Sequence, residues 1–214
     1  MRAMPRKPAA LQFDTREALQ TRAFEMFGRA GYEGVSVGDI AAAAGLSKGA
    51  LYWHFQGKED LYVACQARLH ALFNDYIFEP MRAEADAIQG VLSLFRGLAR
   101  LAADPRIAQG IAGYWLIPDK PETAGIIAAQ RAFDLAGKKV LTEVLRRGQA
   151  QGRIDLGGDL EDMARAIISL VEAVVLPLRH QTAAEVHRTL GVLARTFFRA
   201  YASADDLLKQ TRGI

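Results

Sequence analysis

Apolar residues recur every three or four positions along almost the whole chain, and no segment alternates between apolar and polar residues in the manner of a strand. This periodicity predicts an all-α fold. A first helix is expected to begin at Asp14 or Thr15, either of which can cap it, and to end at Gly31. Its apolar stripe consists of Leu19, Ala23, Met26, Phe27 and Ala30.

The next segment predicts two short helices and one long helix. Ser36, followed three residues later by an Asp, forms a capping box that starts a second helix, which ends at Gly45. Ser47 caps a third helix. A turn then leads into a fourth helix over residues 59–78, which is expected to end before Pro80.

The change from short, capped helices to long amphipathic ones predicts two parts of the molecule. A module over residues 14–75 follows a basic, flexible arm over residues 1–13. The long fourth helix joins this module to a helical bundle over residues 76–214. The helices expected in the bundle span residues 84–103, 105–117, 121–150, 159–179 and 183–203.

Composition and charge narrow the class of protein. The single cysteine, Cys65, excludes an internal disulfide and a thiolate metal cluster, and we expect a buried thiol in the reducing cytosol. The N-terminal stretch lacks the apolar core of a signal peptide. Residues 166–178, the most apolar segment, are too short to span a bilayer and include Glu172. The net charge of +3 is compatible with an anionic partner but does not establish one.

Residues 36–55 have the layout of a helix-turn-helix. Small residues at 41–44 allow two short helices to pack closely, and Gly45 tolerates the positive φ of the turn. With Leu51 and Phe55 facing the core, Trp53 points to the opposite side of the third helix. Contact with thymine methyls in the major groove explains an outward indole. The alternatives are a plain helical pair and ordinary surface exposure of the ring.

The side chains around this indole suit a DNA surface. Lys48, at the start of the third helix, can donate to a phosphate or to a guanine edge. Two small residues next to it let the helix approach the bases, and three donors beyond it can reach phosphates. The small residues are Gly49 and Ala50, and the donors are Tyr52, His54 and Lys58.

Residues 31–61 resemble the DNA-binding signature of the tetracycline-repressor (TetR) family of bacterial transcription regulators. The matching elements include the Phe-Gly-x-x-Gly-Tyr turn that ends at Tyr32, Ile40-Ala41, Ala44-Gly45, Leu51-Tyr52, His54-Phe55 and Lys58-Glu59. The resemblance implies that the residues in contact with operator DNA are Ser36, Lys48, Gly49, Ala50, Tyr52, Trp53, His54 and Lys58.

Two features bear on how this operator contact differs from that of relatives. Gly38 stands where many members of the family have Arg or Lys, and a glycine cannot make their contact with DNA. The N-terminal arm carries Arg2, Arg6 and Lys7, which can add phosphate or minor-groove contacts.

Aromatic residues at helical spacing in the bundle have two interpretations. They form a core, or some of them line a cavity, because helical bundles bind small molecules between their helices. Glu172, within an apolar helix, can face a cationic or hydroxylated ligand or pair with an Arg. The candidate ligand residues are Phe73, Tyr76, Phe95, Tyr114, Trp115, Phe133 and Glu172.

The last two long helices carry apolar stripes that are wider than one neighbouring helix needs. The TetR resemblance implies that they pair with those of a second subunit around a two-fold axis. Two recognition helices about 34–36 Å apart then read a near-palindromic operator. The expected interface residues are Ile167, Val171, Val174, Leu190, Leu193 and Phe197.

The resemblance thus implies a ligand-responsive regulator of the bacterial cytosol and nucleoid, most simply a repressor that a small, largely apolar or aromatic ligand releases from DNA. A ligand-gated activator, or a regulator that works through a protein partner, is an alternative. A small helical enzyme with His70 or His180 as base is a second alternative, although no catalytic spacing supports it. His180 and His187 lack a carboxylate partner set, so we expect no metal, and we expect no cofactor and no membrane partner.

Overall fold

The computed structural model describes residues 9–202, so residues 1–8 of the predicted arm lie outside the described part of the chain. Within this part the chain is helical, and a single bridge between Ile154 and Ala202 is the only strand-like pairing. The expected all-α fold is confirmed. The α-helices are α1 (Ala9–Ala30), α2 (Val37–Ala43), α3 (Lys48–His54), α4 (Lys58–Phe73), α5 (Glu79–Ala83), α6 (Ala87–Ala102), α7 (Ala124–Ala150), α8 (Leu160–Val175) and α9 (Ala183–Tyr201).

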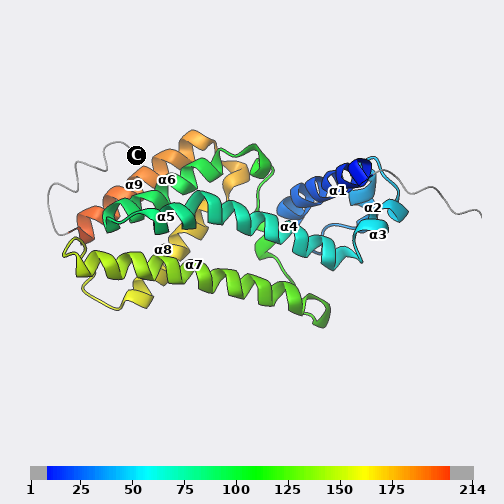
Figure 1. Cartoon of the computed structure of the whole chain (residues 1–214). Helices are drawn as coiled ribbons and strands as arrows, with labels where there is room; N and C mark the ends of the chain where they lie inside the picture. The colour runs from blue at the N-terminus through cyan, green and yellow to red at the C-terminus, as the bar shows by residue number, and fades with distance from the viewer. Residues whose placement is uncertain (1–8, 203–214) are drawn as a thin grey trace, which may run out of the picture.

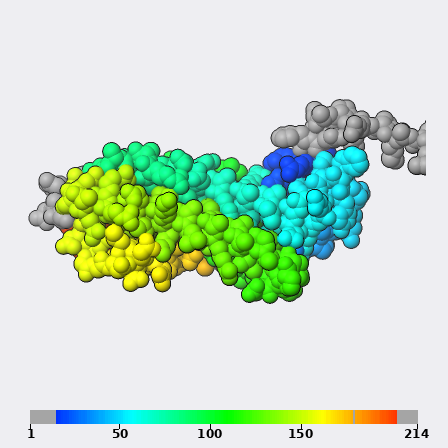
Figure 2. Space-filling model, turned by 60° about the horizontal axis from the view of Figure 1, so that its bottom comes forward, coloured from blue at the N-terminus to red at the C-terminus, as the bar shows by residue number. Residues whose placement is uncertain are grey.

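The molecule has two parts that α4 connects (Figure 1). The first, which we call the head, consists of α1, α2, α3 and the first turns of α4. The second, which we call the bundle, consists of the rest of α4 and the helices up to α9. Figure 2 shows α7 running along one side of the bundle until its N-terminal end reaches the head.

The start of α1 differs from the expectation. Asp14 and Thr15 lie inside α1, which begins at Ala9, so neither residue caps this helix. Residues 9–13, assigned to the arm from the sequence, also belong to the helix. The helix continues through this stretch because a residue that favours a cap position does not by itself interrupt a run of helix-forming residues.

Residues 58–83 form one continuous helical run. A π-helix, Asn74–Phe78, joins α4 to α5, and Pro80 lies in the first turn of α5. Proline is tolerated in a first helical turn, where its missing N–H costs little, and the wider π turn precedes it. The expected end before Pro80 is therefore wrong.

The segment between α6 and α7 is a chain of short turns and not the helix expected over residues 105–117. Two 3-10 turns, Pro105–Ile107 and Ala112–Trp115, are separated by Gly110, whose φ is 88°. Asp104 caps the first turn through its side chain. A third 3-10 turn, Pro121–Thr123, leads into α7.

Candidate nucleic-acid interface and ligand cavity

The helix-turn-helix forms as its local sequence signals predict. The Ser36 hydroxyl caps α2 in a capping box with Asp39, and the Ser47 hydroxyl accepts from the backbone N–H of Ala50 at the start of α3. Gly45 has a φ of 68°, in the left-handed region that glycine enters readily. These three signals are local, which is why the sequence predicts them.

The inner face of α3 is buried and its outer face is open. Leu51 and Phe55 have almost no exposed surface, and they belong to the same buried core as Phe27 of α1. On the other side, Tyr52 is 56% exposed and Trp53 is 71% exposed. Two large rings at this exposure are costly in water, so a partner that covers them gains apolar burial.

Lys48 lies across the first turn of α2. A Cβ atom built on Gly38 would be 3.1 Å from Cε of Lys48 and 3.7 Å from its Nζ. The missing side chain of Gly38 therefore leaves the room that the Lys48 side chain fills. Hydrogen bonds from Ser36 hold the pKa of the Asp39 carboxyl below its usual range, and the Lys48 ammonium lowers this pKa further.

The remaining predicted DNA residues have different surroundings. Gly49 faces open space, with Ser47 Oγ as the nearest atom, at 3.7 Å from its built Cβ. The Ser36 hydroxyl donates to Asp39 over 2.6 Å and so belongs to the cap. His54 is half-buried. The Lys58 ammonium lies 4.3 Å from the centre of the Tyr32 ring, and burial lowers its pKa, so it is held by a contact within the head.

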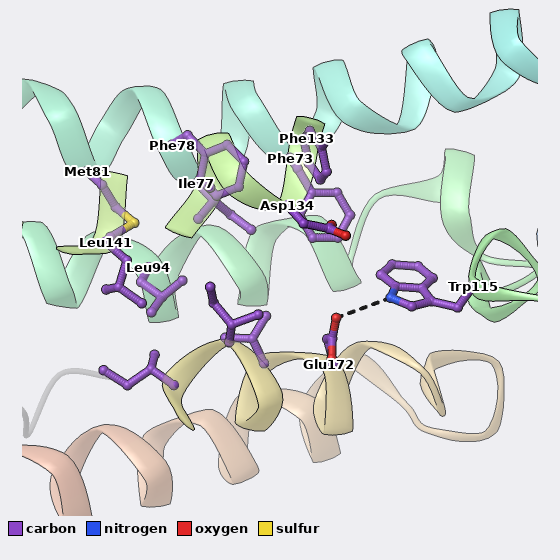
Figure 3. A pocket seen from close by; sticks show the side chains of 14 residues that line it. Phe73, Ile77, Phe78, Met81, Leu94, Trp115, Phe133, Asp134, Leu141 and Glu172 are labelled. Carbon is purple, nitrogen blue, oxygen red and sulfur yellow. Dashed lines mark hydrogen bonds between the residues drawn. The ribbon is translucent and has the colours of Figure 1, made fainter. Parts of the chain in front are cut away.

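A cavity lies inside the bundle between α4, α7, α8 and the turn that carries Trp115 (Figure 3). It encloses about 600 Å³ of space between atoms, its open mouth included. Four of the expected ligand residues line it: Phe73, Trp115, Phe133 and Glu172. The Trp115 indole N–H donates to the Glu172 carboxylate over 3.3 Å.

Three of the expected ligand residues do not line this cavity, which corrects the expectation for them. The Tyr76 hydroxyl donates to Asp104 over 2.8 Å. Phe95 faces a separate apolar groove between α6, α8 and α9. Tyr114 is buried against α1, where its hydroxyl donates to the Phe24 carbonyl over 3.2 Å. These placements depend on contacts between distant segments, which helical spacing does not encode.

Other residues of the cavity were missed from the sequence. Asp134 directly follows Phe133, which was an expected ligand residue. Burial raises the pKa of the Asp134 carboxyl, and the hydrogen bond that Gln130 donates to it lowers this pKa only in part. From Phe73 onwards, apolar residues of α4, the π-helix and α5 recur every three or four positions. This spacing places them on one helical face and could have predicted that they line the same cavity. The missed residues are Ile77, Phe78, Met81, Leu94, Asp134, Gly137, Leu141 and Ile168, with Ile167 and Val171, which had been assigned to the dimer interface.

The turn Ala112–Trp115 joins the cavity to the head. On one side it carries Trp115 into the cavity. On the other side Gly113 lies so close to α1 that a built Cβ would be 2.0 Å from the Phe27 carbonyl oxygen. The neighbouring Tyr114 bonds to α1 as well. A displacement of Trp115 therefore acts on a turn that is packed directly against the backbone of α1.

The expected dimer residues lie mostly inside one chain. Ile167, Val174, Leu190 and Phe197 are buried in the core, and Val171 and Leu193 are half-buried. This corrects the expectation for the four buried residues, because a residue covered by its own chain does not form the outer surface of an interface. For Val171 and Leu193 the interface stays a prediction. The exposed apolar side chains of this region are Leu170, Leu176 and Val192.

The cysteine, the possible metal ligands and the apolar helices were also considered as sites. Burial raises the pKa of the Cys65 thiol to about 12, as a buried structural thiol requires. Groups of His, Cys, Asp and Glu that could hold a metal ion do not occur among the described residues. Over the same residues, the helices fall short of the length and apolarity needed to cross a membrane.

Known proteins resemble this chain in sequence and in fold. The family model described as "Bacterial regulatory proteins, tetR family" matches residues 21–65, which include the whole helix-turn-helix. The protein named "Probable acrEF/envCD operon repressor" of Escherichia coli (strain K12) is 28% identical over 165 residues, which cover 74% of this chain and 73% of the relative. Residues 21–65 therefore carry the DNA-binding domain of the TetR family. The resemblance of residues 31–61 to the TetR signature is thereby confirmed, and the relatives that share it are transcriptional regulators.

Two solved structures extend the TetR likeness to the fold of both parts. A TetR transcriptional regulator from Chloroflexus aurantiacus has a TM-score of 0.75 and 23% identity, and the match covers 91% of this chain and all (100%) of that one. The SmeT–triclosan complex has a TM-score of 0.70 and 23% identity, with 91% and 94% covered. By contrast, the chain spans 27%, 35% and 55% of the lengths of three curated regulators to which it is 41%, 39% and 39% identical.

Proposed function

We propose that the protein is a transcriptional repressor that binds operator DNA as a homodimer in the bacterial cytosol and leaves it when a small molecule occupies the bundle cavity. The observation that carries this proposal is the outer face of α3. Tyr52 and Trp53 are exposed there while the inner face of the same short helix is buried. The match of residues 21–65 to the TetR family model supports the proposal, since TetR proteins are transcriptional regulators.

The α3 face has the groups that recognise a duplex. The indole of Trp53 offers an apolar surface for thymine methyls, and Gly49 permits close approach to base edges. Lys48 reaches over α2 through the space that Gly38 leaves, so it supplies a positive charge beside the position where relatives have Arg or Lys. The proposed DNA residues are Ser36, Lys48, Gly49, Ala50, Tyr52, Trp53, His54 and Lys58, the last of which must release its contact with Tyr32 to reach a phosphate.

The dimer follows from the small size of one recognition helix. A helix of seven residues reads few base pairs, so two copies about 34–36 Å apart are needed for an operator of useful affinity. We assign the interface to the outer faces of α8 and α9, where Leu170 is 50% exposed and Val192 is 54% exposed. The buried residues beneath, such as Leu190, support this surface from within.

The cavity supports control by a ligand. Its aromatic walls suit a small, largely apolar or aromatic molecule. Its occupation acts on two routes to the head, α4 with its π-helix and the turn Ala112–Trp115. A ligand changes DNA affinity only as far as it prefers one conformer, and about a 10⁴-fold preference moves a balance from 1:99 to 99:1. The structural neighbour SmeT forms a complex with triclosan, a small molecule.

An activator would differ from a repressor only in the effect that the DNA-bound protein has on RNA polymerase. The DNA module and the cavity are the same in both cases, so the position of the operator relative to the promoter decides between them. A reporter gene placed behind the natural promoter tests this directly. Higher reporter output after deletion of the protein supports repression, and lower output contradicts it.

Substitutions on the α3 face test the site. Operators are selected from a random pool of duplexes with the full-length protein, and affinity is measured by fluorescence anisotropy. Tyr52→Ala should weaken binding by about 1–3 kcal/mol if the ring contacts bases or their phosphates. Lys48→Ala should weaken binding and also reduce the slope of log K against log salt by about one unit, since one phosphate contact is lost.

Exposed residues outside the head give matched controls for these variants. Leu135→Ala and Lys139→Ala remove an apolar and a cationic side chain from the exposed surface of α7. Both should keep wild-type operator affinity. Unchanged binding by Tyr52→Ala and Lys48→Ala alike would remove α3 as the DNA surface.

A further inference from the structure

A second hollow, which we call the α5–α7 recess, lies on the outside of the bundle where α5 packs against α7. Figure 1 shows these two helices beside each other, at the end of the bundle away from the head. The recess encloses about 700 Å³ of space between atoms, its open side included. Its lining residues are different from those of the cavity, so it is a separate site.

The charged side chains of the α5–α7 recess are mostly basic. Arg82 of α5 lines it together with Lys139 and Arg147 of α7, and Glu143 is the one carboxylate among the described residues that does so. The Glu143 carboxylate already has a partner, since Arg146 donates to it over 2.6 Å from outside the recess. The positive charges around the recess therefore exceed the negative charge, and the excess attracts an anion.

Arg147 carries a positive charge that its surroundings leave uncompensated. Its side chain is half-buried, and its Nε is buried without a hydrogen-bond partner. The ion pairs among the described residues do not include it. A partly buried charge without a partner is unfavourable, so an anion that reaches this guanidinium relieves the cost.

Two more cations are available to the same anion. Lys139 is exposed and, within the described part of the chain, takes part in none of the ion pairs. Arg82 donates to Glu79 over 2.6 Å and to Asn74 over 3.3 Å, in both cases through Nη1. The N–H groups of its Nη2 remain for a ligand. An anion in the recess can therefore be held from α5 and from α7 at once.

We infer that the α5–α7 recess binds an elongated polyanion of the oligophosphate class. Lys139 and Arg147 lie eight positions apart on α7, which is about 12 Å along the helix axis. An anion that contacts both ends of this row is itself elongated. Guanidinium groups present paired N–H donors that match phosphate oxygens, and two of the three cations are arginines. The site is independent of the proposed operator contact, because α3 lies in the head.

Three phosphate compounds test the class of ligand. Tripolyphosphate, orthophosphate and ATP are each titrated into the full-length protein in a calorimeter, without DNA or magnesium and at one ionic strength. Tripolyphosphate should bind at least about tenfold more tightly than orthophosphate, because only the chain reaches several cations. ATP distinguishes the source of the phosphates: tighter binding than tripolyphosphate indicates a nucleotide, and weaker binding indicates an inorganic chain. Equal affinity for tripolyphosphate and orthophosphate would overturn the inference.

Charge variants assign the binding to the recess. Arg147→Gln should weaken tripolyphosphate binding about tenfold, since charge-assisted hydrogen bonds are lost. Lys139→Gln should weaken it at least about threefold, and because Lys139 is exposed this variant keeps the test valid if Arg147→Gln does not fold. Glu143→Gln should tighten binding, because it removes the carboxylate that repels the anion. Arg96→Gln, which removes the same positive charge from the exposed face of α6, is the control and should bind as the wild type does.

Lys48→Ala separates the recess from the proposed DNA surface, which also attracts phosphates. This variant should bind tripolyphosphate as the wild type does. Loss of binding in Lys48→Ala, with wild-type binding in Arg147→Gln and Lys139→Gln, would place the anion on the head and overturn the inference. A protein that selects no duplex from the random pool overturns the proposed function and leaves the calorimetric result standing.

Discussion

Trp53 and Trp115 lie in opposite surroundings, and each marks one of the two proposed sites. Trp53 is exposed to solvent on α3, while Trp115 is half-buried and donates a hydrogen bond to Glu172. The orientation of Trp53 followed from the helical period, since Leu51 and Phe55 fix the inner face. The partner of Trp115 could not be predicted, because Glu172 comes from a helix far along the chain.

His70 connects α4 to the cavity through a chain of hydrogen bonds. Its ring stacks on Phe133 with centroids 3.8 Å apart, and its Nε2 lies 3.3 Å from the amide oxygen of Gln130. Gln130 in turn donates to Asp134 over 2.8 Å. Burial lowers the pKa of His70, and the hydrogen bond to Gln130 offsets part of this effect. A structural role explains this histidine better than catalysis does.

The lowered pKa of His70 makes stability depend on pH. Between its folded pKa and the ordinary value of 6.5, the unfolded chain binds more protons than the folded one. The free energy of unfolding should therefore be full above pH 6.5 and fall as the pH drops below it. Urea unfolding of the wild type and of His70→Gln at several pH values measures this, and the variant should lose less stability.

His187, on the exposed face of α9, gives the matched control. His187→Gln should reproduce the wild-type loss of stability with falling pH. Equal pH dependence in the wild type and His70→Gln would contradict the assignment of this effect to His70.

At the scale of elements, helix boundaries set by local signals were predicted, whereas those set by tertiary contacts were not. The caps at Ser36 and Ser47 and the turn at Gly45 act within a few residues, so the helix-turn-helix was predicted correctly, whereas the start of α1 was not. The run through Pro80 and the turns after α6 depend on neighbouring helices. Sequence periodicity alone therefore placed helix ends there wrongly.

The turn Ala112–Trp115 is an element whose form depends on a missing side chain. A Cβ built on Gly113 would meet two carbonyl oxygens of α1 and the backbone nitrogen of Gly31, which follows α1, and the nearest of these atoms is 2.0 Å away. A Cβ built on Gly28 of α1 would likewise lie 2.4 Å from the Gly110 carbonyl oxygen. The two segments meet through glycines because any larger residue would separate their backbones.

Gly113→Ala should destabilise the protein because backbone atoms, unlike flexible side-chain ends, cannot give way cheaply. We expect a loss of about 1–3 kcal/mol in the free energy of unfolding, as for overpacked sites. Denaturant unfolding measures it. Gly125→Ala, in the first turn of α7, is the control, because its built Cβ meets only the Glu59 side chain, at 3.4 Å. Wild-type stability of Gly113→Ala would show that the turn can move away from α1 at no cost.

At the scale of the whole molecule, the proposed DNA surface and the cavity lie in different parts of the chain, and α4 connects these two parts. The head presents α3 at one end, and the cavity lies in the bundle beyond α4 (Figures 1 and 3). The all-α architecture was predictable from periodicity, and the TetR resemblance of the head was predictable from residues 31–61. The inner and outer faces of α8 and α9 were not, because both are apolar in sequence and only the packed structure shows which one is covered.

Accessibility of Trp53 in the protein–DNA complex tests the central claim most directly. In Trp115→Phe, Trp53 is the only tryptophan, so its quenching by acrylamide reports the solvent exposure of the α3 face. Operator affinity, measured alongside by anisotropy, confirms that the variant is bound. The account predicts that the quenching constant falls several-fold when operator DNA is added and stays unchanged with the same concentration of a duplex that the protein does not bind. An equally quenchable Trp53 in a saturated operator complex would contradict it.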